Sequence, residues 1–201
     1  HMSEHKTPKI KVGITHGDIN GIGYEVLLKA LGDTRITELC TPVIYGSAKI
    51  ANYYRKGMEL PEFKLFQIDS PDSAATDEIN IINVVGEDCK LEPGQPTPNG
   101  GKAALAALER AVSDLRDGLI DVLVTAPINK KTIHSDDFNF PGHTEYLQDR
   151  LGEGHQAMMI MCAEGLRVAL VTIHEPISNV AGSITSKGIT DKLVAFNRSL
   201  V

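Results

Sequence analysis

Side chains that could take part in chemistry follow apolar runs at three places in the sequence. At a fourth place such side chains follow a glycine. They are His16-Gly17-Asp18 after KIKVGIT, Asn129-Lys130-Lys131 after VLVTAPI, His174-Glu175 after VALVTI, and His143-Thr144-Glu145 within NFPGHTEYL. Parallel strands place their carboxyl ends at one edge of a sheet, and ligands of such sheets bind beyond that edge. The three polar run ends therefore predict an active site there.

His174 is the candidate metal ligand, because a neutral imidazole is the commonest metal ligand and this one directly follows an apolar run. A complete metal site takes three or four protein groups. The sequence shows no obvious partners, since the other histidines considered lie in tail or loop contexts: His5, His16, His134 and His155. A histidine that binds no metal remains the alternative.

Lys130 and the glycines of GDINGIG are candidates for binding an anion. A lysine beyond a strand end can bind a phosphate or carboxylate as a point charge; for Lys131 a solvated turn is the favoured reading. Glycines between a strand and a helix let a backbone approach a phosphate. Their spacing here is not the dinucleotide fingerprint. A tight turn with Asp18 as a helix cap explains the same residues.

His143 and Thr144 begin a segment with a helical pattern. In one interpretation both side chains bind a ligand. In the other, Thr144 caps the helix EYLQDRLG and His143 is a surface residue. The local spacing does not separate the two.

Apolar runs alternate with helical patterns along most of the chain. Strands are predicted at 9–15, 40–46, 64–68, 79–85, 121–128, 157–163 and 166–174, and helices at 24–33, 47–58, 102–118 and near the C-terminus. Ser47 is the predicted N-cap of the second helix and Gly118 the end of the third, while 92–101 reads as a Pro/Gly linker. This order predicts an α/β fold, a mainly parallel sheet flanked by helices.

The bulk composition excludes several classes of protein. The 201 residues carry a net charge of −6, which argues against nonspecific nucleic-acid binding. No apolar run is long enough for a membrane span, and no secretory signal is visible after the cloning remnant at residues 1–2. Three scattered cysteines are expected to be reduced thiols of a cytoplasmic protein.

Four motifs together resemble the 4-hydroxythreonine-4-phosphate dehydrogenase family. They are ITHGDINGIGYE, VTAPINKK, FPGHTEYL and LRVALVTIHEPI, and the resemblance extends from Lys9 to about Ile184. It implies oxidation of a phosphorylated hydroxy amino acid with NAD or NADP and a divalent metal such as zinc, magnesium or cobalt. The 3-oxo product then loses carbon dioxide. A cytoplasmic homodimer with an isocitrate and isopropylmalate dehydrogenase-like fold is also implied.

The resemblance assigns roles to five residues of this sequence. His143 and Thr144 match the family's substrate-binding pair, and His174 matches its first metal-ligating histidine. Lys130 is a further substrate-binding candidate, and Asp18 is expected in the cleft. Many family members carry prolines in the first motif at three positions that differ here: His16, Ile19 and Tyr24.

The resemblance also implies a truncated chain, because family members are considerably longer. We expect a tail with a tag remnant at 1–8, a first α/β lobe at 9–126 and the start of a second lobe at 127–201. A catalytically inactive fragment that binds phosphometabolites is one alternative. The other is a sister dehydrogenase acting on a phosphorylated sugar acid such as 4-phospho-threonate.

Overall fold

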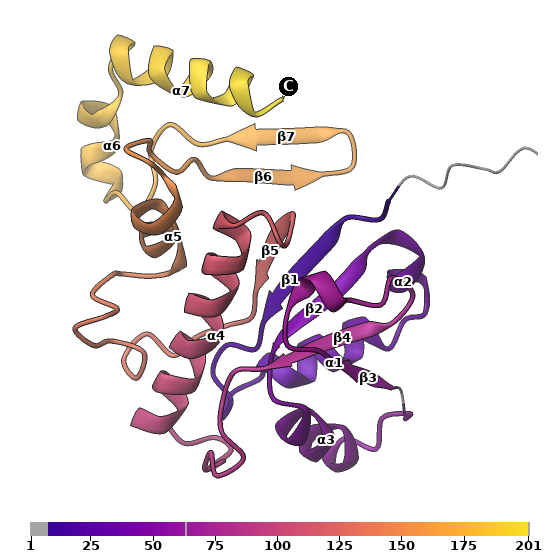
Figure 1. Cartoon of the computed structure of the whole chain (residues 1–201). Coiled ribbons are helices and arrows are strands. Elements are labelled where there is room, and N and C mark those ends of the chain that lie inside the picture. The colour runs from indigo at the N-terminus through magenta and orange to yellow at the C-terminus, as the bar shows by residue number, and fades with distance from the viewer. Residues whose placement is uncertain (1–7, 63, 201) are drawn as a thin grey trace, which may run out of the picture. The chain divides into compact units, whose positions relative to one another are not determined.

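The structure, a computed structural model, describes residues 8–62 and 64–200 (Figure 1). Contacts within the chain divide it into two compact units, with the first ending at Tyr146 and the second beginning at Leu147. Each unit is described by itself. The lobe boundary predicted after residue 126 stays a prediction.

The first unit contains a five-stranded sheet in which every pair of neighbouring strands is parallel. Its order is β3-β4-β2-β1-β5. The strands are β1 (Lys11–Thr15), β2 (Thr41–Gly46), β3 (Leu65–Gln67), β4 (Ile79–Asn83) and β5 (Val122–Thr125). The predicted α/β class with a parallel sheet is confirmed, and the strands are shorter than the apolar runs suggested.

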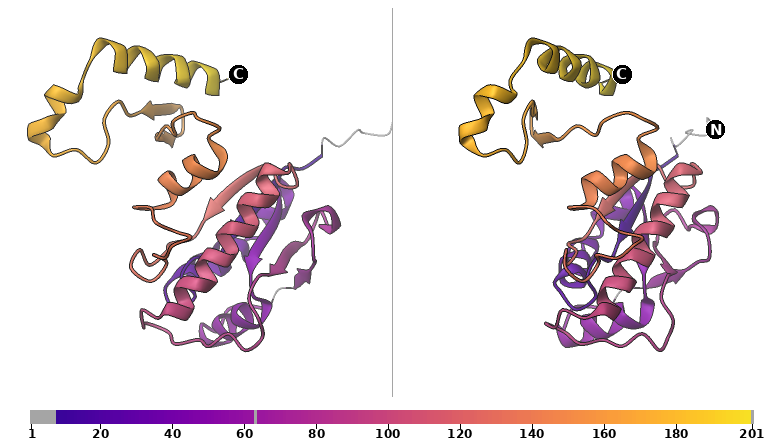
Figure 2. Two further views of the ribbon diagram at one scale, coloured as in Figure 1. Left: turned by 60° about the vertical axis from the view of Figure 1, so that its left-hand side comes forward. Right: turned by 90° about the vertical axis from the view of Figure 1, so that its left-hand side faces the viewer.

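Helices cover both faces of this sheet (Figures 1 and 2). On one face, α1 (Gly23–Leu31) and α3 (Ala48–Gly57) pack with β2 residues such as Ile44. On the other, α4 (Pro98–Arg116) packs through its alanines against residues such as Val43. Strand side chains alternate between faces, so neighbours in β2 enter different cores. Two shorter helices, α2 (Arg35–Leu39) and the 3-10 helix Pro71–Ser73, were not predicted.

The caps of the helices follow local chemistry. The Ser47 hydroxyl accepts a hydrogen bond from Ile50 N–H at the start of α3, as predicted. The predicted linker at 92–101 is too long, because α4 begins at Pro98, where a missing N–H costs nothing. The Thr97 hydroxyl caps this helix by accepting from Gly100 N–H at 3.0 Å. Gly118, with φ of 73°, follows the end of α4.

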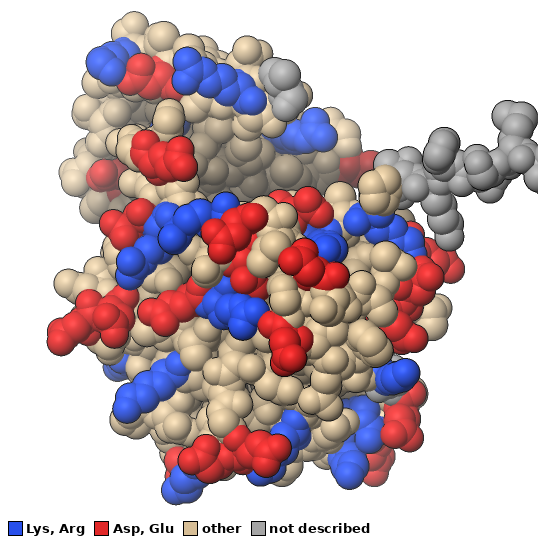
Figure 3. Space-filling view, in the orientation of Figure 1, with Lys and Arg blue, Asp and Glu red and all other residues tan. Residues whose placement is uncertain are grey.

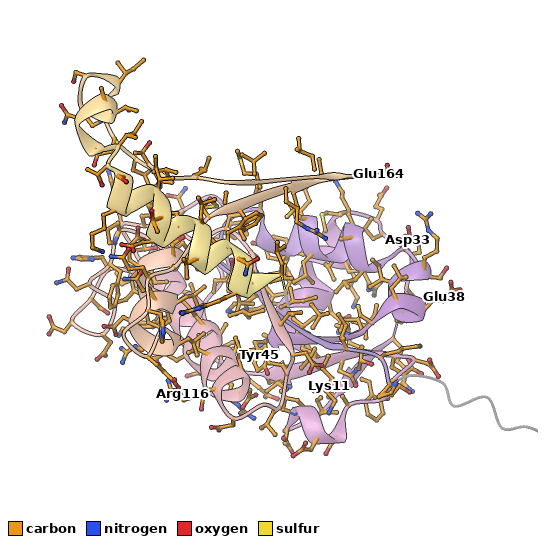
Figure 4. All side chains as sticks on the ribbon, turned by 90° about the horizontal axis from the view of Figure 1, so that it is seen from above. Lys11, Asp33, Glu38, Tyr45, Arg116 and Glu164 are labelled. Carbon is orange, nitrogen blue, oxygen red and sulfur yellow. The ribbon has the colours of Figure 1, made fainter. Side chains whose placement is uncertain are left out.

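A buried polar network ties α4 to the centre of the sheet. The Tyr45 hydroxyl (Figure 4) donates to Asp114 Oδ2 at 2.8 Å, and Arg110 Nε donates to the same carboxylate at 3.2 Å. Burial, and then the bond to Asp114, raise the pKa of Tyr45. These hydrogen bonds give partners to the Tyr45 hydroxyl and the Asp114 carboxylate, which would otherwise be costly to bury.

On the face of the first unit that Figure 3 shows, acidic and basic side chains are intermingled. Ion pairs of the first unit include Lys9 with Asp77 and Arg35 with Asp33, both at 2.6 Å. Neither sign dominates this face. No helix in the described part of the chain is long and apolar enough to cross a membrane.

The strand order creates a switch point between β1 and β5. The chain leaves β1 through α1 on one face of the sheet and reaches β5 through α4 on the other. In open parallel sheets, the crevice for a ligand lies at the carboxyl ends of two such strands. The loops that follow them meet there, because Asp18 N–H donates to Pro127 O at 2.9 Å.

The second unit contains an antiparallel hairpin of β6 (Ile160–Ala163) and β7 (Leu166–Ala169). Its turn is Glu164-Gly165, as predicted, and Glu164 lies at the tip (Figure 4). Two helices follow, α6 (Ile177–Ser183) and α7 (Ser186–Ser199). The prediction of a strand reaching residue 173 in a parallel sheet is wrong. Among the described residues, no strand pairs with 170–173. β7 therefore ends at Ala169, which pairs with Ile160, the first residue of β6.

His16 is a fully buried histidine that joins four segments of the first unit. Its Nε2–H donates to Ala103 O in α4 at 2.8 Å, because a carbonyl can only accept. Nδ1 therefore accepts from the Tyr24 hydroxyl at 2.7 Å, and that oxygen accepts from Ser47 N–H at 2.9 Å. Every polar atom of the imidazole is satisfied in the neutral form.

Acid is expected to destabilise the fold through His16. Burial lowers its pKa from 6.5 to about 4, so the unfolded chain binds more protons between these values. Stability present above pH ~6.5 is lost as the pH falls towards ~4, by about 3 kcal/mol in total. Urea denaturation across this range measures the loss. His16→Gln should remove this part of the pH dependence, whereas exposed His155→Gln should leave it; an unchanged slope in His16→Gln would contradict the assignment.

Candidate functional site

The turn after β1 is held by close backbone contacts at two glycines. Gly17 has φ of +66°, and a Cβ there would lie 2.2 Å from Pro127 O. A Cβ on Gly23 would lie 2.3 Å from His16 O. Side chains at either position would collide with backbone, so these glycines serve a tight turn. The geometry favours this reading over approach to a phosphate.

Asp18 lies half-buried in the same turn, between β1 and the start of α4. Its Oδ1 accepts from Asn20 N–H at 3.1 Å and lies 3.0 Å from the Cβ position of Gly100. The residue does not cap α1, whose N-cap is Ile22 without a side-chain bond. The carboxylate instead borders the first turn of α4, at the switch point. Its predicted role in a cleft stays a prediction.

Asn20 is a buried residue of this turn that the sequence reading missed. Its amide donates to Thr97 Oγ1 at 3.0 Å and accepts from Glu92 N–H at 2.8 Å. Its own carbonyl accepts from Gly94 N–H at 2.7 Å. Asn20 thus anchors the segment that precedes α4. An asparagine between turn glycines signals local backbone bonding, yet its partners lie far along the chain.

Lys130 lies at the tip of the turn that follows β5. Asn129 Oδ1 accepts from the N–H groups of Lys131 and Thr132, and Asn129 O accepts from Ile133 N–H. These bonds fix the backbone around Lys130, whose side chain is exposed. Lys130 therefore presents a positive charge near the switch point.

Gly101 sets how closely this turn packs against α4. A Cβ on Gly101 would lie 1.8 Å from Thr132 O, a distance that no real side chain tolerates. The turn carrying Lys130 thus crosses directly over a helical glycine, and Ile133 beside it is buried. Gly101 is a second residue that the sequence reading passed over, because only tertiary contact reveals its role.

His143 begins the helix α5 (His143–Leu151), and Thr144 is its second residue. Thr144 therefore does not cap the helix. His143 is half-buried rather than on the surface, and its Nε2 is buried without a hydrogen-bond partner among the described residues. Burial and then the positive charge of Lys130 lower the pKa of His143. The imidazole is neutral near pH 7 and has an unused polar atom.

An aromatic cluster holds the start of α5 in place. The ring of Tyr146 stacks on Phe138 with centroids 5.1 Å apart, and Phe140 meets both rings edge-on. Phe138 and Tyr146 are almost fully buried. Phe138 and Phe140 precede His143 in the chain, and Tyr146 follows it. Packing of these rings, rather than helix propensity, therefore positions His143.

Lys130 and Glu145 both border Gly142. A Cβ on Gly142 would lie 3.7 Å from Glu145 Oε2 and 4.0 Å from Lys130 Nζ. An ammonium and a carboxylate thus lie close to a position that has no side chain, and His143 is the next residue in the chain. The first unit therefore places Lys130 close to His143, which Thr144 follows in the chain, and adds Glu145. The substrate-binding roles of Lys130, His143 and Thr144 stay predictions.

His174 belongs to the second unit, in the segment 170–176 after β7. It is exposed and has φ of 54°, and it does not stand at the end of a strand. In the described part of the chain, no three His, Cys, Asp or Glu side chains are grouped so that they could hold a metal ion. Because a complete site takes three or four protein groups, these residues do not form one. His174 stays a predicted single ligand.

The three cysteines are all free thiols, with Cys162 exposed and the other two half-buried.

Relatives of known sequence cover nearly all of this chain. A 4-hydroxythreonine-4-phosphate dehydrogenase of Bacteroides thetaiotaomicron is 49% identical over 192 residues, covering 96% of this chain and 52% of the relative. A D-threonate 4-phosphate dehydrogenase of Cupriavidus necator is 36% identical over 165 residues, covering 81% of this chain and 49% of the relative. The chain spans about half the length of the curated relatives it matches.

Solved structures agree with the fold. A crystal structure of a 4-hydroxythreonine-4-phosphate dehydrogenase from Burkholderia phymatum has a TM-score of 0.85 and 30% identity, covering 96% of this chain and 59% of that one. The enzyme of the same name from Klebsiella pneumoniae has a TM-score of 0.86 and 26% identity, covering 98% and 60%. A family model described as pyridoxal phosphate biosynthetic protein PdxA matches residues 38–201. This chain therefore belongs to the PdxA family of pyridoxal phosphate biosynthetic proteins.

Proposed function

We propose that this chain supplies the substrate-binding part of a dehydrogenase that acts on 4-phosphooxy-threonine with NAD or NADP. Membership of the PdxA family carries the proposal. In the reaction, a hydride leaves the carbon bearing the secondary alcohol for the nicotinamide, and the hydroxyl proton is released. The 3-oxo acid then loses its carboxylate as carbon dioxide, and the resulting enolate takes up a proton to give 3-amino-2-oxopropyl phosphate.

The residues around Gly142 would bind and orient this substrate. The Lys130 ammonium is suited to a phosphate or a carboxylate. The buried Nε2 of His143 has no partner among the residues that the structure describes, and it is suited to a hydrogen bond with a polar substrate group. Thr144 adds a hydroxyl beside it. Since orientation of a reacting group can supply several orders of magnitude in rate, these contacts would govern turnover.

For the metal, the proposal names one ligand of this chain, and for the nucleotide it names none. A divalent ion would act as a Lewis acid on the reacting oxygen, and His174 would be one of its ligands. The described residues do not complete that site, and no residue of this chain is assigned to the nucleotide. A homodimer likewise stays a prediction.

The experiment is steady-state turnover by the polypeptide that the complete reading frame encodes. NADH or NADPH formation is followed with 4-phosphooxy-threonine and, in parallel, with D-threonate 4-phosphate. The second substrate is included because relatives of both names match the chain. Faster turnover of the amino acid supports the proposal, faster turnover of the hydroxy acid supports the sister activity, and no turnover of either refutes both.

Replacing His174 by alanine in that polypeptide is expected to raise the divalent-ion concentration for half-maximal activity by at least about tenfold. One imidazole fewer weakens the metal site, and excess metal should restore part of the rate. His155→Ala, which removes an exposed histidine of the same unit, is the matched control. An unchanged metal requirement in His174→Ala would refute the ligand assignment.

A further inference from the structure

Glu145 places a carboxylate oxygen close to the Gly142 position. Its side chain is half-buried, and it forms no hydrogen bond or ion pair with the described residues. A carboxylate in the first turn of α5 is favoured by the helix dipole. The dipole explains an acidic residue near this end of the helix. It does not supply a hydrogen-bond donor to Glu145 Oε2, the oxygen beside Gly142.

Lys130 does not form an ion pair with Glu145. Lys130 Nζ borders the same glycine, yet no ion pair within 4.0 Å joins Lys130 to Glu145. One negative and one positive group, each available to a ligand, thus border the same small space. The unpartnered Nε2 of His143 belongs to the next residue in the chain. A ligand that carries both an ammonium and an anion fits this set of groups.

We propose that Glu145 binds the ammonium group of the amino acid substrate and so determines specificity at this site. The inference rests on the proposed function. The 4-phosphooxy-threonine molecule carries an ammonium, whereas D-threonate 4-phosphate has a hydroxyl at that carbon. Lys130, which borders the same glycine, would hold an anionic group of the same molecule.

A carboxylate distinguishes these two substrates by charge. An ammonium that donates to a carboxylate makes a charge-assisted hydrogen bond, which is about twice as strong as a neutral one. A hydroxyl also bonds more strongly to a carboxylate than to a neutral amide oxygen, but it carries no charge and therefore loses less than an ammonium when the carboxylate is replaced. Glutamine at position 145 keeps the shape and an acceptor oxygen but loses the charge, so it should penalise the amino acid much more than the hydroxy acid.

The test is Glu145→Gln in the polypeptide of the complete reading frame. We expect kcat/KM for 4-phosphooxy-threonine to fall about 30-fold, mostly through KM, as loss of one charged hydrogen bond implies. The value for D-threonate 4-phosphate should stay within about threefold. Glu164→Gln, at the exposed tip of the β6–β7 hairpin, is the matched control. Thermal unfolding verifies that each variant is folded.

The possible outcomes separate this inference from the proposed function. Wild-type turnover of neither substrate, or of the hydroxy acid alone, overturns the inference together with the proposed function. Normal wild-type turnover, with equal losses on both substrates or with no loss in Glu145→Gln, overturns the inference alone.

If Glu145→Gln does not fold, Gly142→Ala takes its place. Its methyl group makes only ordinary contacts with Glu145 and Lys130, and unchanged kcat/KM for the amino acid would then overturn the inference.

Discussion

Replacing His143 by alanine is expected to lower kcat/KM for 4-phosphooxy-threonine by about 100-fold in the polypeptide of the complete reading frame. The buried Nε2 of His143 has no partner in the described protein, so a substrate group is its expected partner. Truncation removes that hydrogen bond and leaves the substrate less well oriented. Steady-state kinetics with saturating nucleotide and metal measures the loss.

The pH dependence of kcat/KM distinguishes substrate binding by His143 from a merely structural role. Burial and the charge of Lys130 lower the pKa of His143, so the active neutral form is lost only as the pH falls through that lowered value. Lys130→Met removes the positive charge, which raises the pKa of His143. The acid limb of the rate profile should therefore move to higher pH in this variant.

Controls distinguish these effects from general damage. His134→Ala removes an exposed histidine from the same unit and should leave kcat/KM unchanged. Full activity of His143→Ala, or an unmoved acid limb in Lys130→Met, would refute the assigned role of this pair.

Replacing Gly101 by alanine is expected to destabilise the first unit by about 3 kcal/mol. The new methyl group would overlap Thr132 O, which lies 1.8 Å from the Cβ position. Neither the first turn of α4 nor the backbone of the turn that carries Lys130 can yield by that much without losing other contacts. The gain in helix propensity from glycine to alanine, about 1 kcal/mol, is too small to compensate. Urea denaturation followed by circular dichroism measures the change.

Gly57→Ala is the matched control for this prediction. Gly57 is also helical, and a Cβ there meets nothing within 4 Å. This variant should be as stable as the wild type or more stable by up to about 1 kcal/mol. Equal stability of the Gly101→Ala and Gly57→Ala variants would show that the turn carrying Lys130 is not packed as described.

The sequence by itself was sufficient for the α/β class, the sheet strands of the first unit and most of the helix ends. Apolar runs and caps such as Ser47 and Gly118 act over a few residues, so their effect is readable locally. The four motifs were also sufficient for the family. The run VALVTI was misleading, because a strand needs a partner and β6 supplies one only as far as Ala169.

Only the tertiary structure decided how the candidate site is built. It showed His16 to be a satisfied core residue, although His16 and Asp18 follow the same strand. It also revealed the anchoring by Asn20, the close crossing at Gly101 and the nearness of Lys130 and Glu145 to Gly142. Apart from that of Glu145 with Gly142, these contacts join residues far apart in the chain, and they depend on which strands adjoin and on which face each helix packs.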